Sequence, residues 1–204
     1  MEMQKETDLT DSYTEIMMSQ IQQHFICNTL GTIEQLCMEQ PEIASKLVHD
    51  FSLYLRGNFR EMNSNVPISL SQEIEHVRHY VAIEQIRFPD MAIRFELYSE
   101  EFLLPPLTIQ PLVENAIRHG LMGLESGGTI IISTYETDPY YCVSVVDDGV
   151  GFKMPLTTDG RLHIGIHNIE GRLKNMCGGT LTVESSPGKG TKALIRIPRE
   201  EIQV

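Results

Sequence analysis

Residues 110–120 read QPLVENAIRHG, and they indicate the fold when they are taken with two glycine-bearing segments further along the chain. These segments are DDGVGF at 147–152 and SSPGKGT at 185–191. Together they predict a helix that carries a Glu114–Asn115 pair, a carboxylate at the end of a strand, and two tight backbone turns. A magnesium–nucleotide complex needs such parts: an oxygen ligand for the metal, an acceptor for an amino group on the base, and backbone able to approach phosphates closely.

The carboxylate belongs to Asp147, which ends a predicted strand. Val143, Val145 and Asp147 share one face of that strand, because side chains alternate between the two faces. A carboxylate on an apolar strand face is costly unless it is paired, and the exocyclic amine of adenine would pair with it. An ordinary Asp-Gly turn is the alternative when this segment is taken alone.

The predicted helix at 107–122 offers further polar groups. The side-chain oxygen of Asn115 is a neutral, hard ligand for Mg²⁺, and the metal in turn bridges phosphate oxygens. Arg118 and His119 follow on the same helix and face either phosphates or solvent. The alternative is a helix that merely has a polar face. A second helix, beginning near Gly165, would offer free backbone N–H groups to a phosphate.

Glycines also mark the last of these segments. Gly188 and Gly190 bracket Lys189 in a turn where a missing Cβ permits close approach. Residues 152–164 are expected to form either a lid or a plain surface loop. The chain has no Gly-Lys-Ser/Thr loop of the Walker type, so it is not a P-loop enzyme.

The pattern of apolar residues divides the chain near residue 90, and the fold class it predicts is α+β. Residues 9–90 are expected to form a helical region, with a hairpin broken at Gln40–Pro41 and a third helix at about 70–87. Residues 91–200 are expected to form an α/β sandwich with helices on one face of a sheet. Its strands are predicted at 92–98, 129–137, 141–146, 180–185 and 192–197, and its helices at 107–122 and 165–176.

A stripe of polar or small residues runs along the first predicted helix. At helical spacing it holds Gln20, His24, Asn28, Gly31 and Gln35. One interpretation is an ordinary solvated face. The other is that the exposed ring of His24 attacks an incoming phosphoryl group, while Asn28, four residues on, holds the ring in one tautomer.

Two neighbouring apolar faces on the same helix predict a homodimer. One face holds Met18, Ile21 and Phe25, and the other holds Ile26, Leu30 and Ile33. One antiparallel partner helix can cover only one of them, and monomers rarely expose a long apolar strip. A symmetric four-helix bundle would cover both faces.

The composition excludes several classes of protein. The net charge of −12 argues against a nucleic-acid binder, which needs a basic face. Four cysteines, far apart and without a Cys-x-x-Cys pair, indicate a reduced, cytoplasmic chain without a zinc site. No apolar run approaches the roughly 18 residues that span a bilayer, and the start MEMQKETDLT lacks the apolar segment of a signal peptide.

The second half resembles the Bergerat-type ATP-binding domain that is shared by gyrase, heat-shock chaperones, sensor histidine kinases and mismatch-repair proteins. Its boxes follow the order of that family: LVENAIRHG at 112–120, DDGVG at 147–151, HIGIHN at 163–168 and GKGT at 188–191. QIQQHFICNTL at 20–30 and YVAIEQIRF at 80–88 narrow the resemblance to the cytoplasmic part of a LytS/YesM-type sensor histidine kinase. The resemblance covers about residues 14–198.

The resemblance implies a kinase that phosphorylates its own histidine with Mg²⁺ and ATP and passes the phosphoryl group to a response regulator. His24 would accept the phosphoryl group on a dimerising hairpin, Asn115 would hold Mg²⁺, and Asp147 would bind the adenine amine. Glu114 would orient water or the metal shell. The other implied nucleotide-binding residues are Arg118, His119, Gly149, Gly151, Gly165, Asn168, Gly188, Gly190 and Thr191.

Such kinases carry a membrane sensor upstream, so this chain is expected to be either a catalytic fragment or a soluble kinase. It departs from the family pattern at Gln23, where proline is usual, at Cys27, where an aromatic is usual, and at His163, where glycine opens the second box. The change at His163 slightly favours a rival function, a catalytically weak scaffold that dimerises and binds nucleotide. An ATPase switch of the gyrase type is disfavoured, because the helical hairpin precedes the ATP-binding domain and no transducer domain follows.

Overall fold

The computed structural model divides the chain into two compact units, 1–63 and 64–204. The residues it describes are 23–61, 64, 66–99, 101–122, 124, 127–153 and 161–199, with the side chains of 161–164 left out. The predicted apolar residues Met18 and Ile21, like Gln20 of the polar stripe, lie outside the described residues.

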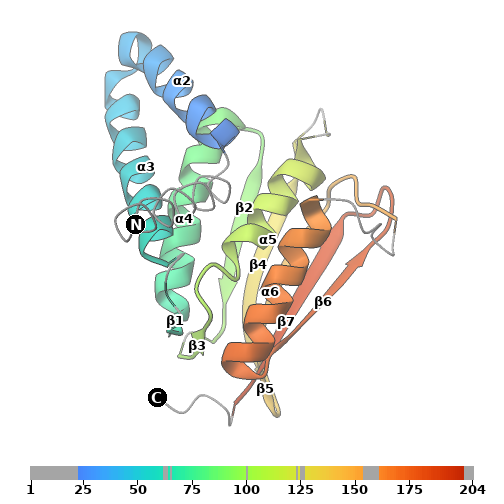
Figure 1. Cartoon of the computed structure of the whole chain (residues 1–204). Coiled ribbons are helices and arrows are strands. Elements are labelled where there is room, and N and C mark those ends of the chain that lie inside the picture. The colour runs from blue at the N-terminus through green and yellow to red at the C-terminus, as the bar shows by residue number, and fades with distance from the viewer. Residues whose placement is uncertain are drawn as a thin grey trace, which may run out of the picture. The chain divides into compact units, whose positions relative to one another are not determined.

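The first unit contains a helical hairpin, as predicted (Figure 1). Helix α2 spans Gln23–Glu39 and helix α3 spans Pro41–Glu61, with Gln40 alone between them. Proline is favourable at the first position of α3, because the N–H it lacks has no partner there and its fixed φ suits a helix. The ring of Phe25 packs 6.2 Å from that of Phe51 and 5.0 Å from that of Tyr54, centroid to centroid, so aromatic contacts join the two helices.

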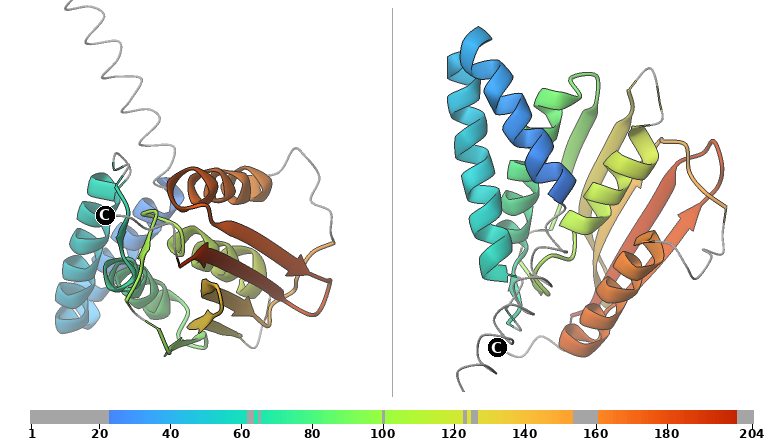
Figure 2. Two further views of the ribbon diagram at one scale, coloured as in Figure 1. Left: turned by 90° about the horizontal axis from the view of Figure 1, so that it is seen from below. Right: turned by 45° about the horizontal axis from the view of Figure 1, so that its top comes forward.

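The second unit is a two-layer α/β sandwich, which confirms the predicted fold class (Figures 1 and 2). Its five-stranded sheet has the order β2-β4-β5-β7-β6, in which β2 and β4 are parallel and the other pairs antiparallel. The strands are β2 Ala92–Leu97, β4 Thr129–Thr137, β5 Tyr140–Asp147, β6 Thr180–Ser185 and β7 Thr191–Pro198. Helices α4 Leu70–Arg87, α5 Gln110–Asn115 and α6 Arg161–Cys177 form the layer over one face of the sheet.

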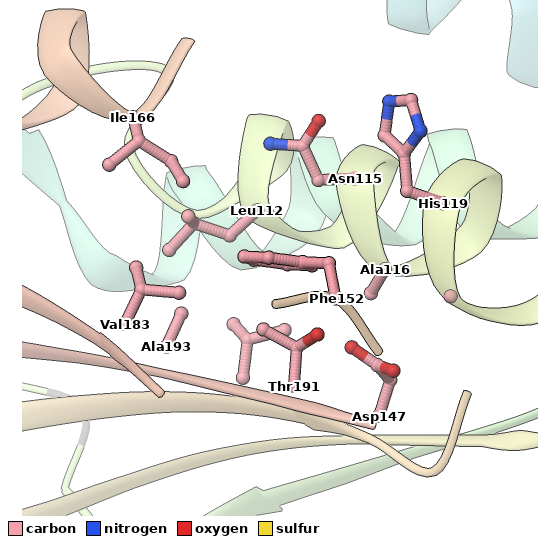
Figure 3. A pocket seen from close by; sticks show the side chains of 12 residues that line it. Leu112, Asn115, Ala116, His119, Asp147, Phe152, Ile166, Val183, Thr191 and Ala193 are labelled. Atoms are coloured by element: carbon pink, nitrogen blue, oxygen red, sulfur yellow. The ribbon is translucent and has the colours of Figure 1, made fainter. Parts of the chain in front are cut away.

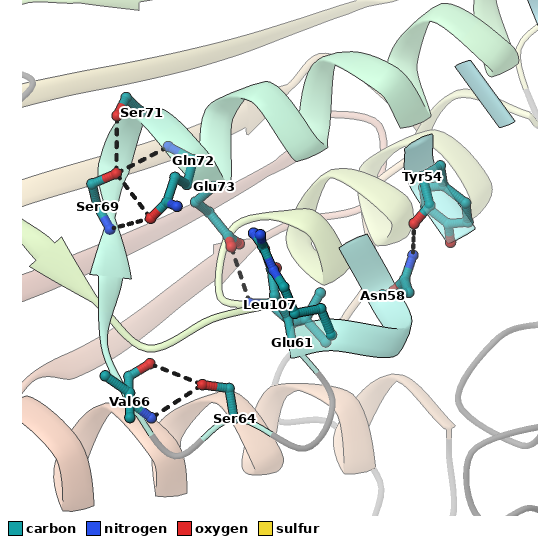
Figure 4. Close-up of polar contacts among 11 residues, drawn as sticks. Tyr54, Asn58, Glu61, Ser64, Val66, Ser69, Ser71, Gln72, Glu73 and Leu107 are labelled. Carbon is teal, nitrogen blue, oxygen red and sulfur yellow. Dashed lines mark hydrogen bonds and ion pairs between the residues drawn. The ribbon is translucent and has the colours of Figure 1, made fainter. Parts of the chain in front are cut away.

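Helix α4 belongs to the second unit, whereas the sequence pattern grouped it with the helical region that ends near residue 90. The guanidinium of Arg78 lies 4.1 Å from the ring centroid of Phe95 on β2, and the backbone N–H of Leu70 donates to the carbonyl of Phe102. A capping box at Ser69 and Gln72 starts the helix (Figure 4). Periodicity gives the extent of a helix but not the layer on which it packs, so the two divisions differ by about one helix.

The helix predicted at 107–122 is composite. Helix α5 ends at Asn115 and continues as a π-helix, η1, over Ala116–Leu121. A small antiparallel pair, β1 Ile68–Ser69 with β3 Leu103–Leu104, precedes it in the chain and was not predicted. Strands of two residues are too short to show alternation, and one π turn leaves no periodic signal, so neither feature is readable from the sequence.

Candidate functional site

A pocket lies between the helix layer and the sheet of the second unit, where α5 and η1 face strands β5, β6 and β7 (Figure 3). Four of the predicted site residues line it: Asn115, His119, Asp147 and Thr191. The other lining residues are Leu112, Ala116, Gly120, Val145, Phe152, Ile166, Val183 and Ala193. The pocket therefore combines an apolar wall with polar groups contributed by the helix and by the strand ends.

Asp147 supplies the buried carboxylate of this pocket. It ends β5, pairs in register with Ile130 and Thr191, and is 4% exposed. Its Oδ1 accepts a hydrogen bond from the backbone N–H of Gly149 at 3.0 Å. Burial raises the pKa of this carboxyl, while hydrogen bonds from the backbone N–H groups of Gly149 and Thr191 oppose that rise. The predicted position of Asp147 on the apolar face of its strand is thus confirmed.

Glycines let η1 and the strand ends come close to Asp147. A Cβ on Gly120 would lie 2.7 Å from the Asp147 Oδ1, and one on Gly149 would lie 2.4 Å from the carbonyl carbon of Gly120. A Cβ on Gly190, whose φ is +71°, would lie 1.9 Å from the Asp147 carbonyl oxygen. Side chains at these positions would push the helix and strands apart, so the pocket depends on their absence.

The two glycine-bearing segments also meet each other. The N–H of Gly188 donates to the carbonyl of Val150 at 2.7 Å, and a Cβ on Gly151, whose φ is +58°, would lie 2.1 Å from the Ser186 carbonyl oxygen. Gly165 differs, because a Cβ there would meet no atom within 4 Å. The structure thus gives a steric reason for Gly151, whereas the role predicted for Gly165 stays a prediction.

The helical side of the pocket carries the polar groups of the first motif. Asn115 is half-buried and lies beside His119 along the helix (Figure 3). Burial and the charge of Arg118 lower the pKa of His119. Glu114 does not line the pocket: its Oε1 accepts a hydrogen bond from the side-chain amide of Gln110 at 2.6 Å. Arg118 is half-buried and does not line it either.

The apolar wall was not predicted, because its residues have the types and spacing of ordinary core residues. The ring of Phe152 lies between the helix and Thr191 in the middle of the pocket (Figure 3). The backbone N–H of Phe152 donates to Ser185 Oγ at 2.9 Å, which ties this residue to the end of β6. The free space among the lining residues is about 30 Å³, enough for a water molecule or two and much less than a purine needs.

His24 and Asn28 lie in the first unit, on α2. Both ring nitrogens of His24 are within reach of Asn28 Nδ2, at 3.1 Å for Nδ1 and 3.3 Å for Nε2. His24 is exposed, as the polar stripe predicted, and Asn28 is half-buried. Asn168 is exposed on α6 and is not among the residues that line the pocket. The structure therefore brings four predicted residues together and places the predicted acceptor pair on a separate unit.

The two glycines of the GKGT segment should respond very differently to alanine. Gly190→Ala should lower the free energy of unfolding of the second unit by roughly 3 kcal/mol or more, because its Cβ would collide with rigid backbone. Gly188→Ala should lower the free energy of unfolding by only about 1–2 kcal/mol. Its φ of +73° makes alanine unfavourable, but the added Cβ would meet nothing within 4 Å. Thermal unfolding followed by circular dichroism measures both, and equal losses would contradict this packing of Gly190 against Asp147.

Comparison with protein families identifies two matching regions. A sequence model described as "Histidine kinase" matches residues 13–92. A second, described as "Histidine kinase-, DNA gyrase B-, and HSP90-like ATPase", matches residues 106–201 and so contains every residue that lines the pocket.

Individual proteins extend this likeness over most of the chain. The protein YwpD of Bacillus subtilis, described as putative and uncharacterized, is 35% identical over 189 residues, which are 89% of this chain and 68% of YwpD. The sensor histidine kinase BtsS of Escherichia coli is 32% identical over 197 residues, so this chain covers 93% of its own length but only 34% of BtsS. Among solved structures, the blue-light activated histidine kinase EL346 of Erythrobacter litoralis shares the fold, with a TM-score of 0.52 and 16% identity over 88% of this chain and 59% of EL346.

Proposed function

Since this chain belongs to the LytS-type sensor histidine kinases, we propose that it phosphorylates His24 with ATP and passes the phosphoryl group to a response regulator. The chain spans about a third of the length of BtsS and of the sensor protein LytS of Oceanobacillus iheyensis. The proposal therefore concerns the activity of this chain and not that of a whole sensor kinase. The single observation that supports it best is the buried carboxylate of Asp147, which faces a pocket bounded by the helix of Asn115 and His119.

The base of ATP would bind at the sheet side of this pocket. The carboxylate of Asp147 would accept a hydrogen bond from the exocyclic amine of adenine, which guanine lacks at that position. Leu112, Ile166 and Val183 would contact the faces of the ring, which matches the apolar character of their part of the pocket. The Phe152 side chain would have to move, because the present free space is too small for a purine.

The residues on α5 and η1 suit a magnesium–phosphate complex. Proteins commonly bind Mg²⁺ through one or two oxygen ligands together with substrate phosphates, and the amide oxygen of Asn115 is one such ligand. Glu114, adjacent in the chain, would orient water of the metal shell. Bound Mg²⁺ would neutralise charge on the phosphates. The ring of His119 and the cationic Arg118 lie one turn further on and would contact phosphate oxygens.

His24 would be the nucleophile. A lone pair on its ring forms the N–P bond to the γ-phosphorus, the bond from that phosphorus to the β–γ bridging oxygen breaks, and ADP leaves with the electron pair. For attack by Nε2, the ring must carry its proton on Nδ1. The side-chain amide nitrogen of Asn28 lies 3.1 Å from Nδ1. If the amide is turned so that its oxygen faces the ring, that oxygen would accept a hydrogen bond from Nδ1–H and hold the proton there.

Sensor histidine kinases in general work as homodimers with response-regulator partners, and we include both partners in the proposal. Among the residues that the structure describes, no helix is both long and apolar enough to cross a bilayer. A membrane sensor joined upstream, and a reaction in the cytoplasm where ATP is available, remain parts of the proposal that the family suggests.

Incubation with γ-labelled ATP tests the proposed activity. Label should appear on the chain only when Mg²⁺ is present, and it should be lost in acid but kept in base, as a phosphoramidate requires. Omission of Mg²⁺ with excess EDTA is the matched control. If the chain binds ATP but takes up no label, the rival function, a nucleotide-binding scaffold, replaces the kinase.

The dimer should depend on Leu30. This residue of α2 belongs to the second predicted apolar face and is 53% exposed in the single chain. Leu30→Asp should weaken dimerisation at least a hundredfold, because the two protomers together would lose about 3–6 kcal/mol of apolar burial. Light scattering over a range of concentrations measures the mass, with Gln35→Asp on the exposed polar stripe as the control. A parent that stays monomeric at micromolar concentration, or a variant that dimerises like the parent, would rule out this interface.

A further inference from the structure

We propose that Glu73 is a positioning residue for metal–nucleotide binding, because its carboxylate fixes the start of the helix that carries Asn115. The inference rests on the proposed function and assigns a role to a residue of α4 that the sequence patterns did not single out. Glu73 lies in the second unit together with the pocket, although it does not line it.

The carboxylate of Glu73 is fully buried and accepts hydrogen bonds from four consecutive backbone N–H groups. Its Oε2 accepts a hydrogen bond from the N–H of Leu107 at 3.0 Å (Figure 4). Its Oε1 accepts hydrogen bonds from the N–H groups of Thr108 at 2.8 Å, Ile109 at 2.7 Å and Gln110 at 3.3 Å. Burial raises the pKa of Glu73, while these hydrogen bonds oppose that rise. A side chain with so many bonds to one turn holds that turn in place.

These N–H groups belong to the turn that leads into α5, ending with its N-cap Ile109 and its first residue Gln110, and the helix has no side-chain cap of its own. Ile109 occupies the N-cap position and its side chain makes no capping hydrogen bond. The first N–H groups of a helix have no partner within it, and a negative charge there is favourable. The hydroxyl of Thr108, next to the N-cap, donates instead to the carbonyl of Pro105 at 2.6 Å. Glu73 therefore supplies from α4 the cap that the local sequence lacks.

The same turn is held from the other side by α6. Leu107 has a φ of +53°, a left-handed conformation that is strained for a branched side chain. The guanidinium of Arg172 donates to its carbonyl oxygen, while Glu73 accepts from its N–H. Arg172 is itself half-buried, and burial lowers the pKa of its guanidinium, while the charge of Glu73 opposes that shift. A strained residue persists where its surroundings determine it from several sides, and here both polar groups of Leu107 are held.

This arrangement determines where Asn115 lies relative to Asp147. Asn115 ends the helix whose first turn Glu73 caps, whereas Asp147 stands on the sheet. Loosening the cap would shift the helix against the sheet and displace the proposed metal ligand, but it would leave the adenine-binding carboxylate in place. When a residue that positions a metal ligand through hydrogen bonds is lost, the affinity for the metal typically falls roughly ten- to a hundredfold.

Glu73→Gln tests whether Glu73 positions the metal ligand without affecting the adenine site. The amide keeps the shape of the side chain but replaces one acceptor oxygen with a donor. Calorimetry with the full chain should show that affinity for ADP with Mg²⁺ falls roughly ten- to a hundredfold. Affinity for ADP without Mg²⁺, and the preference for adenine over guanine nucleotides, should stay close to the parent's. Glu75→Gln, at an exposed position on the same helix, should change neither.

Four results would overturn the inference. If a folded Glu73→Gln chain binds ADP with Mg²⁺ as tightly as the parent, Glu73 has no positioning role, and the proposed kinase function is unaffected. A folded variant that loses affinity equally with and without Mg²⁺ makes Glu73 a general structural residue. A parent that binds no adenine nucleotide refutes the proposed function and this inference together. If Glu73→Gln does not fold, Arg172→Lys, which withdraws the guanidinium from Leu107, should show the same selective loss, and its absence there also overturns the inference.

Discussion

Replacing His24 with glutamine should abolish phosphorylation of the chain and leave its affinity for ATP nearly unchanged. Glutamine has a polar side chain of moderate length but no basic ring nitrogen that can attack phosphorus. The residues that line the proposed nucleotide pocket all belong to the second unit, whereas His24 belongs to the first. Loss of the acceptor should therefore remove the product of the reaction without changing the binding site for its substrate.

Two measurements on the same preparation separate these effects. Label from γ-labelled ATP reports the reaction, and calorimetry reports the affinity for the nucleotide. His49→Gln is the matched control, because His49 is an exposed histidine on α3 of the same unit. Label that persists in the His24 variant, or a His49 variant that also loses it, would refute His24 as the sole acceptor.

Asp147→Ala should weaken ATP binding by roughly ten- to a hundredfold. A hydrogen bond to a charged group contributes about 1.5–3 kcal/mol, and the carboxylate of Asp147 is 4% exposed, so water competes with it little. GTP should bind poorly to the parent, because its base lacks the amine that Asp147 would recognise. Asp148→Ala is the control: Asp148 is exposed, and its carboxylate accepts from the backbone N–H of Thr129 at 2.7 Å instead of facing the pocket.

The affinity for ATP should also depend on pH through Asp147. Burial raises the pKa of this carboxyl, and only the ionised form accepts the amine fully. The affinity should therefore be complete well above that pKa and begin to fall, on acidification, at a higher pH than an exposed aspartate would give. Asp148→Ala should keep a dependence of this kind but move it to lower pH, because the charge of Asp148 contributes to the raised pKa of Asp147. Equal affinities for ATP and GTP, or an affinity for ATP that is insensitive to Asp147→Ala, would refute adenine recognition by this residue.

Much of the fold could be predicted because its elements are long and regular. The break at Pro41 and the third helix follow from proline chemistry and from apolar spacing, and the five strands of the sheet are rich in β-branched residues. The division of the chain was less predictable. A helix such as α4 shows an apolar stripe whichever layer it packs on, so periodicity could not show that it joins the sheet.

The candidate site was predictable where a polar residue stood in an apolar pattern. Asp147 was found because a carboxylate on an apolar strand face needs a partner. Phe152 was not, because an apolar residue near a pocket looks like any core residue. Glu73 was missed for the opposite reason: a glutamate on a helix is usually solvated, and its burial depends on a turn more than 30 residues away in the chain. Contacts between distant segments leave no mark on local spacing.

Mapping the phosphorylated residue tests the central claim most directly. The parent chain, incubated with Mg²⁺ and ATP and kept at neutral or alkaline pH, is digested and its peptides are sequenced by tandem mass spectrometry. The account predicts a single phosphoryl group, on the imidazole of His24, and much less of it when the Asp147→Ala variant is treated for the same time at an ATP concentration below its weakened dissociation constant. A phosphoryl group on any other residue, or none on the parent at saturating ATP, would contradict it.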